Sequence, residues 1–424
     1  MSSRVIEIFE EIVSIEHCSF KAQKLAEYIV DFAKRCGYMV EVDRAGNILA
    51  YTGKPKISLQ SHYDMVCVGK APDIKLKYED NWLSAKESSL GADNGIGVAM
   101  MLALIESGYE LEYLFTSDEE VGLVGAKALE FSLNSQYMLN LDTEEEGVVY
   151  IGCAGGCDVV ASLDTTLEQV RGYGYRVSVS NLPGGHSGIM IDRDIPNAII
   201  ELTRFIDGVN GYIVEFRGGE RRNSIPVNAT ATIITKEPLG DNQSIDIEYL
   251  GEIELECYPN SSKILKKLLG FRHGVKSFDS KLGIPHSSAN LAIVECNKGS
   301  FEVVCSLRSM DNSDLNSFVK ETKEFWLDLG CSVSIQECYP AWKPTMDSWK
   351  EIVLDSIKST FANATTKAIH AGLECGVISQ KYPNISIASI GPNIQNPHSI
   401  KERVDIKSVN RVYSTLIDIV NKYK

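Results

Sequence analysis

The sequence contains no apolar run that approaches the roughly 18 residues needed to cross a membrane. Its first residues, Met1–Val5, lack the basic start and apolar block of a secretory signal peptide, so we expect a cytoplasmic protein without membrane contact. The 11 cysteines stand singly and without framework spacing, which predicts reduced thiols. Cys153 and Cys157 form the one close pair, and without a second pair they are only a weak candidate for a metal clip.

Positive charge is scarce, because the 42 Lys and Arg are outnumbered by 57 Asp and Glu, which gives a net charge of -15. Clustered Lys and Arg drive binding to phosphates, so this balance argues against a nucleic-acid partner. Most of the surplus acid is expected to be solvated surface, although carboxylates are also the groups that divalent cations bind. The chain also lacks internal repeats, low-complexity tracts and flexible linkers, so any inserted domain should be joined at short hinges.

With 424 residues, of which 44% are hydrophobic, the chain is long enough for two to three domains, each with a hydrophobic core. Segments of helical spacing alternate with strand-like runs through the first third of the chain, which predicts an α/β sheet with helices on its faces. Past Gly172 the order strand, helix, strand, strand predicts a smaller α+β module of ferredoxin-like type. From Trp349 onward, the alternation of helical and strand-like segments resumes. We therefore expect one discontinuous domain of residues 1–171 and 339–424 and an inserted domain of residues 172–338.

Five polar clusters fall just beyond predicted strands, where open α/β sheets place their ligand sites. They are Ser61–Asp64, Gly91–Gly95, Thr116–Glu120, Asn140–Thr143 and Pro397–Ser399. Each is weak alone, because a lone histidine is more often structural and a pair of glutamates is more often solvated surface. Together they offer two histidines and three carboxylates. Hydrolysis by two cations about 3.5–4 Å apart needs such donors, including a shared carboxylate.

Seven segments in this order resemble the two-zinc aminoacylase and carboxypeptidase G family. They are SHYDM, GADNGIG, TSDEEVGLVGA, NLDTEEEG, GGHSG, HAGLECG and GPNIQNPHS. Within the family, the closest resemblance is to the aminoacyl-histidine dipeptidases, the carnosine-cleaving bacterial branch, and it runs from about Phe9 to about Val420. It implies an α/β two-zinc exopeptidase domain with an inserted α+β lid domain, through which the chain could form a homodimer.

The resemblance assigns the metal ligands residue by residue. His62 and Asp142 become terminal ligands of one metal ion, Glu120 and His398 those of the other, and Asp93 the bridge. Two dications repel each other strongly, and three anionic ligands nearly neutralise them. Zinc is the expected metal, and manganese or cobalt would also suit these donors. The resemblance further implies a cis peptide bond after Asp93.

Three further residues receive catalytic roles from the resemblance. Asp64 would accept a hydrogen bond from the imidazole of His62, the alternative being an aspartate that forms a turn. Glu119 would act as the general base that takes a proton from the attacking water and passes it to the departing amine. His186, in GGHSG, would stabilise the oxyanion, and in several relatives this histidine comes from the partner subunit. Whether it acts in cis or in trans stays open.

Four residues are candidates for substrate binding. Arg308 resembles an arginine that pairs with the terminal carboxylate of the substrate, the alternative being a surface arginine at a strand end. Asn223 looks like a further substrate-binding position. His370 and Glu374 belong to a motif near the substrate amine, although a packed core histidine is an equal alternative for His370. The acidic run Glu144–Glu146 is interpreted as a solvated loop.

In this family, an aspartate at the position of Asp142 is associated with peptidases that recognise a free amino terminus. We therefore expect hydrolysis of Xaa-His and other short dipeptides. Two alternatives stay open. One is a related amidohydrolase, such as a tripeptidase, an N-acyl amino acid deacylase or a carboxypeptidase, and the other is a non-catalytic protein that binds peptides or metal. The segment SIEHCSF lacks the proline of the relatives, and the inserted module looks short, which could change the pocket or the dimer contact.

Overall fold

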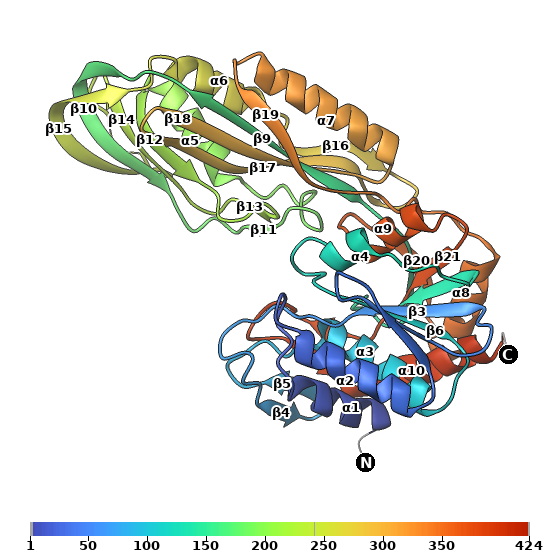
Figure 1. The fold of residues 1–424 in the computed structure, drawn as a ribbon. Coiled ribbons are helices and arrows are strands. Elements are labelled where there is room, and N and C mark those ends of the chain that lie inside the picture. Colours follow the sequence, from blue (N-terminus) through green and yellow to red (C-terminus); the bar gives the residue numbers. More distant parts are fainter. Residues whose placement is uncertain (1–2, 241, 423–424) are drawn as a thin grey trace. The chain divides into compact units, whose positions relative to one another are not determined.

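The computed structural model describes residues 3–240 and 242–422. The chain divides into two compact units (Figure 1). The outer unit consists of Met1–Cys153, Trp342–Ala368 and Leu373–Lys424, and the inserted unit of Ala154–Ala341 and Ile369–Gly372. The expected fold class, an α/β domain that carries an inserted α+β domain, is confirmed.

The inserted unit begins earlier than the expected boundary at residue 172. The reason is that strands β9 (Gly155–Asp164) and β10 (Glu168–Val179) both pair within the sheet of the inserted unit. Its last strand, β19 (Ser332–Tyr339), pairs with β9, so the first and last strands of the insertion are neighbours in one sheet. A short separate segment, Ile369–Gly372, also belongs to this unit and contains His370.

An eight-stranded sheet forms the centre of the outer unit. Its order is β1 (Met39–Val42), β2 (Ile48–Tyr51), β6 (Glu112–Thr116), β3 (Ile57–His62), β7 (Tyr137–Asn140), β21 (Ser386–Ser389), β8 (Val148–Cys153) and β20 (Thr365–Ile369). Strands β6, β3, β7 and β21 run parallel to one another. Every residue of β3 and β6 is buried, as expected for parallel strands covered on both faces.

Seven helices and a small sheet complete the described part of the outer unit. The helices are α1 (Arg4–Val13), α2 (Gln23–Arg35), α3 (Ala92–Glu106), α4 (Val124–Ala128), α8 (Ser348–Thr360), α9 (Glu374–Lys381) and α10 (Ile406–Asn421). The small sheet has the order β22 (Ile394–Gln395), β23 (Arg403–Asp405), β5 (Trp82–Ala85) and β4 (Leu76–Glu79).

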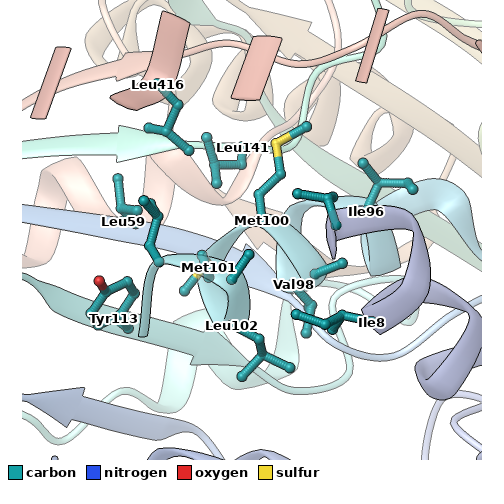
Figure 2. Close-up of a cluster of buried hydrophobic side chains, with 14 of the residues drawn as sticks. Ile8, Leu59, Ile96, Val98, Met100, Met101, Leu102, Tyr113, Leu141 and Leu416 are labelled. Atoms are coloured by element: carbon teal, nitrogen blue, oxygen red, sulfur yellow. The ribbon is translucent and has the colours of Figure 1, made fainter. Parts of the chain in front are cut away.

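Helix α3 is the central element of the outer core. It is apolar on all sides, and all residues from Val98 to Ile105 are buried, which is typical of a helix enclosed by other elements. Ile8 of α1, Leu59 of β3, Tyr113 of β6 and Leu416 of α10 belong to the same cluster (Figure 2). This packing fixes the helix, and therefore also the segment Gly91–Asn94 at its start.

Gly97 of α3 is required by close packing. An added Cβ would clash with Asn94 Oδ1 and would lie 2.6 Å from Ser61 Oγ and 3.0 Å from the backbone oxygen of Leu141. We therefore expect Gly97→Ala to lower the free energy of unfolding by about 1–3 kcal/mol, although alanine is the better helix former. Urea unfolding of the metal-free protein measures this change.

Gly208, the last residue of helix α5 (Ala198–Gly208) in the inserted unit, is the matched control, because its added Cβ would meet no atom within 4 Å outside its own stretch of helix. Gly208→Ala should be neutral or should stabilise the protein by up to about 1 kcal/mol. Equal effects at the two positions would contradict the packing argument.

The inserted unit is built on a nine-stranded sheet. Its order is β15 (Asp246–Cys257), β10, β14 (Ala229–Thr235), β12 (Tyr212–Gly218), β17 (Ile284–Asn297), β18 (Ser300–Ser309), β9 and β19, and β16 (Gly274–Asp279) pairs with β17. Helices α5 (Ala198–Gly208), α6 (Ser261–Gly270) and α7 (Asn312–Leu327) share one core with it. A separate ladder joins β11 (Gly185–His186) to β13 (Ser224–Ile225) and pairs His186 with Ser224.

Four of the cysteines form disulfides, which corrects the expectation that all thiols are reduced. Cys18 is bonded to Cys67, and Cys157 to Cys338. Because Cys157 is engaged in this way, it forms no metal clip with Cys153. The partners are 49 and 181 residues apart in the chain, so spacing along the sequence could not reveal either pair. Among the described helices, none is long and apolar enough to span a membrane.

Candidate metal centre

The five polar clusters of the sequence meet at the carboxyl ends of the parallel strands. His62 is the last residue of β3, Glu120 follows β6 and Asp142 follows β7. These three strands are neighbours in the order β6, β3, β7, so their ends lie at one edge of the sheet. Asp93 joins them from the start of α3, and His398 from the loop after β22.

Two groups of three side chains could each hold a cation. The first consists of His62, Asp93 and Asp142, and the second of Asp93, Glu120 and His398, with the donor atoms in each group within 4.8 Å of one another. A third combination, His62, Glu119 and Glu120, meets the same limit. Asp93 is the member that the first two groups share.

The two carboxylate oxygens of Asp93 face different histidines. Its Oδ1 lies 3.2 Å from His62 Nε2, and its Oδ2 lies 3.1 Å from His398 Nε2. His62 Nε2 is also 3.2 Å from Asp142 Oδ1, and His398 Nε2 is 2.8 Å from Glu120 Oε1. Each imidazole nitrogen therefore faces two carboxylates, and the carboxylate of Asp93 has the geometry of a bridge. As the resemblance implied, the peptide bond after Asp93 is cis.

Two observations show that these residues fit a pair of cations. First, Glu120 Oε1 is buried and has no hydrogen-bond partner among the described residues, although His398 Nε2 is 2.8 Å away. Second, one proton on an imidazole nitrogen cannot satisfy two carboxylates, whereas a cation can be shared by all three groups. Nitrogen and oxygen donors of this kind suit zinc and manganese.

The charges of the cluster lead to the same conclusion. Burial raises the pKa of Glu119 and of Asp142, and it raises the pKa of Glu120 to about 7. Burial opposes ionisation of Asp93 as well, but hydrogen bonds with His398 and His62 hold the pKa of its carboxyl below the usual range. Several buried carboxylates in contact are costly without compensating charge, and divalent cations provide that charge.

Asp64 contacts His62 at Nδ1, the ring nitrogen that does not approach Asp93. His62 Nδ1 lies 3.0 Å from the backbone oxygen of Asp64 and 3.5 Å from its carboxylate, so the carbonyl is the closer acceptor. With its proton on Nδ1, a neutral His62 would present the Nε2 lone pair to a cation shared with Asp93 and Asp142. The carboxylate of Asp64 accepts hydrogen bonds from Ser19 Oγ at 2.7 Å and from the backbone N–H of Glu119 at 2.9 Å. It thus ties the loop after β6 to β3.

Glu119 lies beside the two groups of donors. One of its carboxylate oxygens is within 4.8 Å of donor atoms of His62 and Glu120. The raised pKa of Glu119, caused mainly by burial, makes it a better proton acceptor than an exposed carboxylate. A base with this character next to bound cations can take a proton from water.

Glu374, which was expected near a substrate amine, is fully buried, and its Oε1 has no hydrogen-bond partner among the described residues. Its Oε2 accepts hydrogen bonds from Gln60 Nε2 at 2.5 Å and Thr116 Oγ1 at 2.6 Å. Gln60 lies in β3, and Thr116 is the last residue of β6. Through Oε2, Glu374 therefore supports the strand ends that carry His62 and the loop of Glu119.

Arg308 and His370 belong to the inserted unit and are both buried. Arg308 is 8% exposed and donates a hydrogen bond from Nη1 to Tyr339 Oη at 2.7 Å, so it is not a surface arginine. His370 Nε2 lies 2.7 Å from Ser288 Oγ, while its Nδ1 is buried without a partner among the described residues. Burial and the nearby charge of Arg308 lower the pKa of His370 to about 3, which keeps this imidazole neutral.

His186 and Asn223 lie in the same unit. His186 Nδ1 accepts hydrogen bonds from the backbone N–H groups of Gly188 at 3.1 Å and Ile189 at 3.2 Å, which places the ring proton on Nε2. A Cβ on Gly188 would lie 3.1 Å from His186 and 3.2 Å from Arg308, so these side chains approach the same glycine. Asn223 is exposed, and its backbone oxygen accepts a hydrogen bond from Ser187.

The acidic run after Asp142 differs from the solvated loop that we expected. Glu144 is exposed, but Glu145 pairs with Lys367 at 2.7 Å and Glu146 pairs with Arg411 at 2.6 Å. Two of the three glutamates therefore hold the loop against other segments of the outer unit.

Sequence reasoning missed three residues that support the site. Ser19 binds the carboxylate of Asp64, and Asn94 donates from Nδ2 to the backbone oxygen of Leu141 at 3.0 Å and to Asp142. The third is Glu402, which binds the backbone before α3. Single polar residues produce no spacing pattern, and the only available signal was that Asn94 and Glu402 stand within or next to matched segments.

Residues 58–422 match the family described as Peptidase family M20/M25/M40. The chain is 32% identical over 472 aligned positions to the cytosol non-specific dipeptidase of Escherichia coli K12, covering 98% of this chain and 96% of that protein.

Solved structures agree with this match. The aminoacylhistidine dipeptidase of Vibrio alginolyticus superimposes with a TM-score of 0.83 at 29% identity, covering 99% of this chain and 96% of that one. A tripeptidase of Staphylococcus aureus shares the fold, with a TM-score of 0.61 at 17% identity and coverage of 99% and 98%.

Proposed function

The chain belongs to peptidase family M20/M25/M40 and is a metallopeptidase, and from this premise we propose that it is a dipeptidase that cleaves Xaa-His and other short dipeptides. Similarity to a dipeptidase over nearly the whole chain supports the substrate class. The observation that carries the proposal is the carboxylate of Asp93, whose two oxygens face His62 and His398, with Glu119 beside them. The name of the Escherichia coli relative also supports a cytoplasmic location.

Five residues would hold two divalent cations, which we propose to be zinc, with manganese or cobalt as alternatives. His62 and Asp142 would bind one, Glu120 and His398 the other, and Asp93 both. When bound, the cations would polarise the scissile carbonyl and make a water molecule more acidic.

The protein itself would move the proton and bind the developing charge. The carboxylate of Glu119 would take the proton from the attacking water and deliver it to the nitrogen of the leaving amine. His186 would donate from Nε2 to the oxyanion, either in its own subunit or in the partner of a homodimer formed through the inserted unit. The hydrogen bonds to His186 Nδ1 support this assignment, because they keep the proton on Nε2.

The polar residues of the inserted unit would bind the carboxy-terminal end of the substrate. Arg308 uses Nη1 to bind Tyr339, and its other N–H groups could pair with a carboxylate. His370, which was expected near the substrate amine, is held neutral and has a buried Nδ1 without a partner among the described residues, so it could form a hydrogen bond with a polar group of the substrate. Asn223, which is exposed and directly precedes β13, would add a polar contact to the substrate.

Amine release from a panel of substrates tests the proposal. We expect turnover of β-alanyl-histidine, glycyl-histidine and glycyl-leucine in the presence of zinc or manganese, with the histidyl peptides preferred. Tripeptides and N-acetyl amino acids should be poor substrates. Turnover of N-acetyl amino acids alone would overturn the dipeptidase assignment, and a protein that binds two cations but cleaves none of these amides would be a binding protein.

A further inference from the structure

Glu402 is a buried carboxylate that none of the proposed catalytic roles uses. It is 2% exposed and stands one residue before β23, four residues after His398. Its two oxygens accept hydrogen bonds from four consecutive backbone N–H groups, those of Leu90–Asp93. Oε2 lies 2.7 and 3.0 Å from the first two nitrogens, and Oε1 lies 2.8 and 3.3 Å from the last two.

These N–H groups need a partner because the chain is irregular where it enters α3. Gly91 has a φ of 74°, and Asp93 and Asn94 have non-helical dihedral angles, so the regular helix begins only after them. Backbone donors at the start of a helix have no partner within the helix. The anionic side chain of Glu402 satisfies four of them, and charge-assisted hydrogen bonds of this kind are stronger than neutral ones.

No Lys or Arg forms an ion pair with Glu402 in the part of the chain that the structure describes. An uncompensated buried charge is costly, so its four hydrogen bonds must compensate for its desolvation. This requirement makes the geometry restrictive. Aspartate is one methylene shorter and cannot span the four donors, and glutamine would direct its own NH2 group at two of them.

Glu402 also connects two donors of the candidate metal centre. Its backbone N–H donates to the oxygen of Ser399 at 3.1 Å, which closes the turn directly after His398. Its side chain binds the N–H of Asp93, and Asp93 Oδ2 lies 3.1 Å from His398 Nε2. One residue therefore holds both segments, although Asp93 and His398 are 305 residues apart in the chain.

We propose that Glu402 is a positioning residue that sets the separation of Asp93 and His398 and thereby determines the affinity of the site for its pair of divalent cations. This inference rests on the proposed dinuclear site. Both carboxylate oxygens of Glu402 are bound to the backbone of Leu90–Asp93, so its loss should weaken cation binding and leave KM for a dipeptide nearly unchanged once the site is saturated.

Zinc binding to the demetallated full-length protein provides the test. In Glu402→Gln we expect the affinity for at least one of the two ions to fall by about 10- to 100-fold, measured by competition with a chromophoric chelator. Glu402→Asp should weaken binding in the same direction, and it serves as the second variant if the glutamine variant fails to fold. At saturating zinc, KM for glycyl-leucine should stay within about twofold of the wild-type value.

Glu112→Gln is the matched control. Glu112 is also fully buried, and its oxygens accept hydrogen bonds from the backbone N–H groups of Asn134 at 2.8 Å and Ser135 at 3.0 Å. It lies at the first residue of β6, whereas the ligand loop follows the last. The control should lower the midpoint of thermal unfolding without changing zinc affinity.

Unchanged zinc affinity in both Glu402 variants would overturn the inference. An equal loss of affinity in Glu112→Gln would overturn it too, because the effect would then be general destabilisation. If the wild-type protein binds fewer than two ions, the proposed metal centre itself is wrong and the inference fails with it. The wild-type stoichiometry therefore separates the two failures.

Discussion

Replacement of Glu119 by glutamine will reduce kcat for dipeptide hydrolysis by about 10²- to 10⁴-fold while both cations stay bound. Glutamine keeps the shape of the side chain but cannot accept the proton of water. Because Glu120, rather than Glu119, approaches His398 and completes the group around Asp93, the cation donors are retained in this variant. Steady-state kinetics and the metal content of the same sample, determined by atomic emission, measure the two quantities.

Asp118→Asn is the control for this variant. Asp118 is the neighbouring carboxylate in the same loop, and its Oδ1 accepts a hydrogen bond from the backbone N–H of Phe20 at 2.6 Å. Because it belongs to neither group of donors around Asp93, its loss should change kcat by no more than a few-fold. A Glu119→Gln protein that keeps a tenth or more of the wild-type kcat, or that loses its metal, would contradict the role of general base.

Replacement of Asp93 by asparagine should leave a protein that holds at most one cation and has no measurable peptidase activity. Asparagine offers one acceptor oxygen, so the NH2 group must face either His62 or His398, each of which now lies within 3.2 Å of a carboxylate oxygen. The negative charge that offsets the repulsion of two dications is lost as well. The loss of affinity should exceed the about 10- to 100-fold cost of removing an outer hydrogen-bond partner.

Asp347→Asn provides the comparison for Asp93→Asn. Asp347 caps α8, where it accepts hydrogen bonds from the backbone N–H of Lys350 at 3.1 Å and from Ser386 Oγ at 2.7 Å. Removing its charge costs stability but should leave two ions per chain. Two tightly bound ions in Asp93→Asn would show that Asp93 is not the bridge.

The candidate donors could be found in the sequence because they occur in short motifs that follow strands. In a parallel sheet the carboxyl ends of the strands lie at one edge, so motifs far apart in the chain were expected to meet. The structure does bring His62, Asp93, Glu120, Asp142 and His398 together. Motifs of three to five residues carry such information because the chemistry needs specific side chains at a specific turn, and the resemblance to the two-zinc family assigned the individual ligands.

The surroundings of these donors could not be predicted in the same way. Glu374 was expected near a substrate amine, and only the structure shows that Gln60 and Thr116 bind one oxygen of its carboxylate. The inserted unit begins after Cys153 rather than after Arg171, because strand pairing, and not hydrophobic spacing, decides to which sheet a strand belongs.

By itself, the sequence determined the α/β class with an α+β insertion, the family and the candidate ligands of two cations, because these depend on residue types and on patterns within short segments. The tertiary structure decided which residues support those ligands. The Cys18–Cys67 disulfide joins residues 49 positions apart, and Glu402 binds backbone N–H groups more than 300 positions away. Backbone donors are the same in every residue except proline, so only the folded chain determines which acid they will bind.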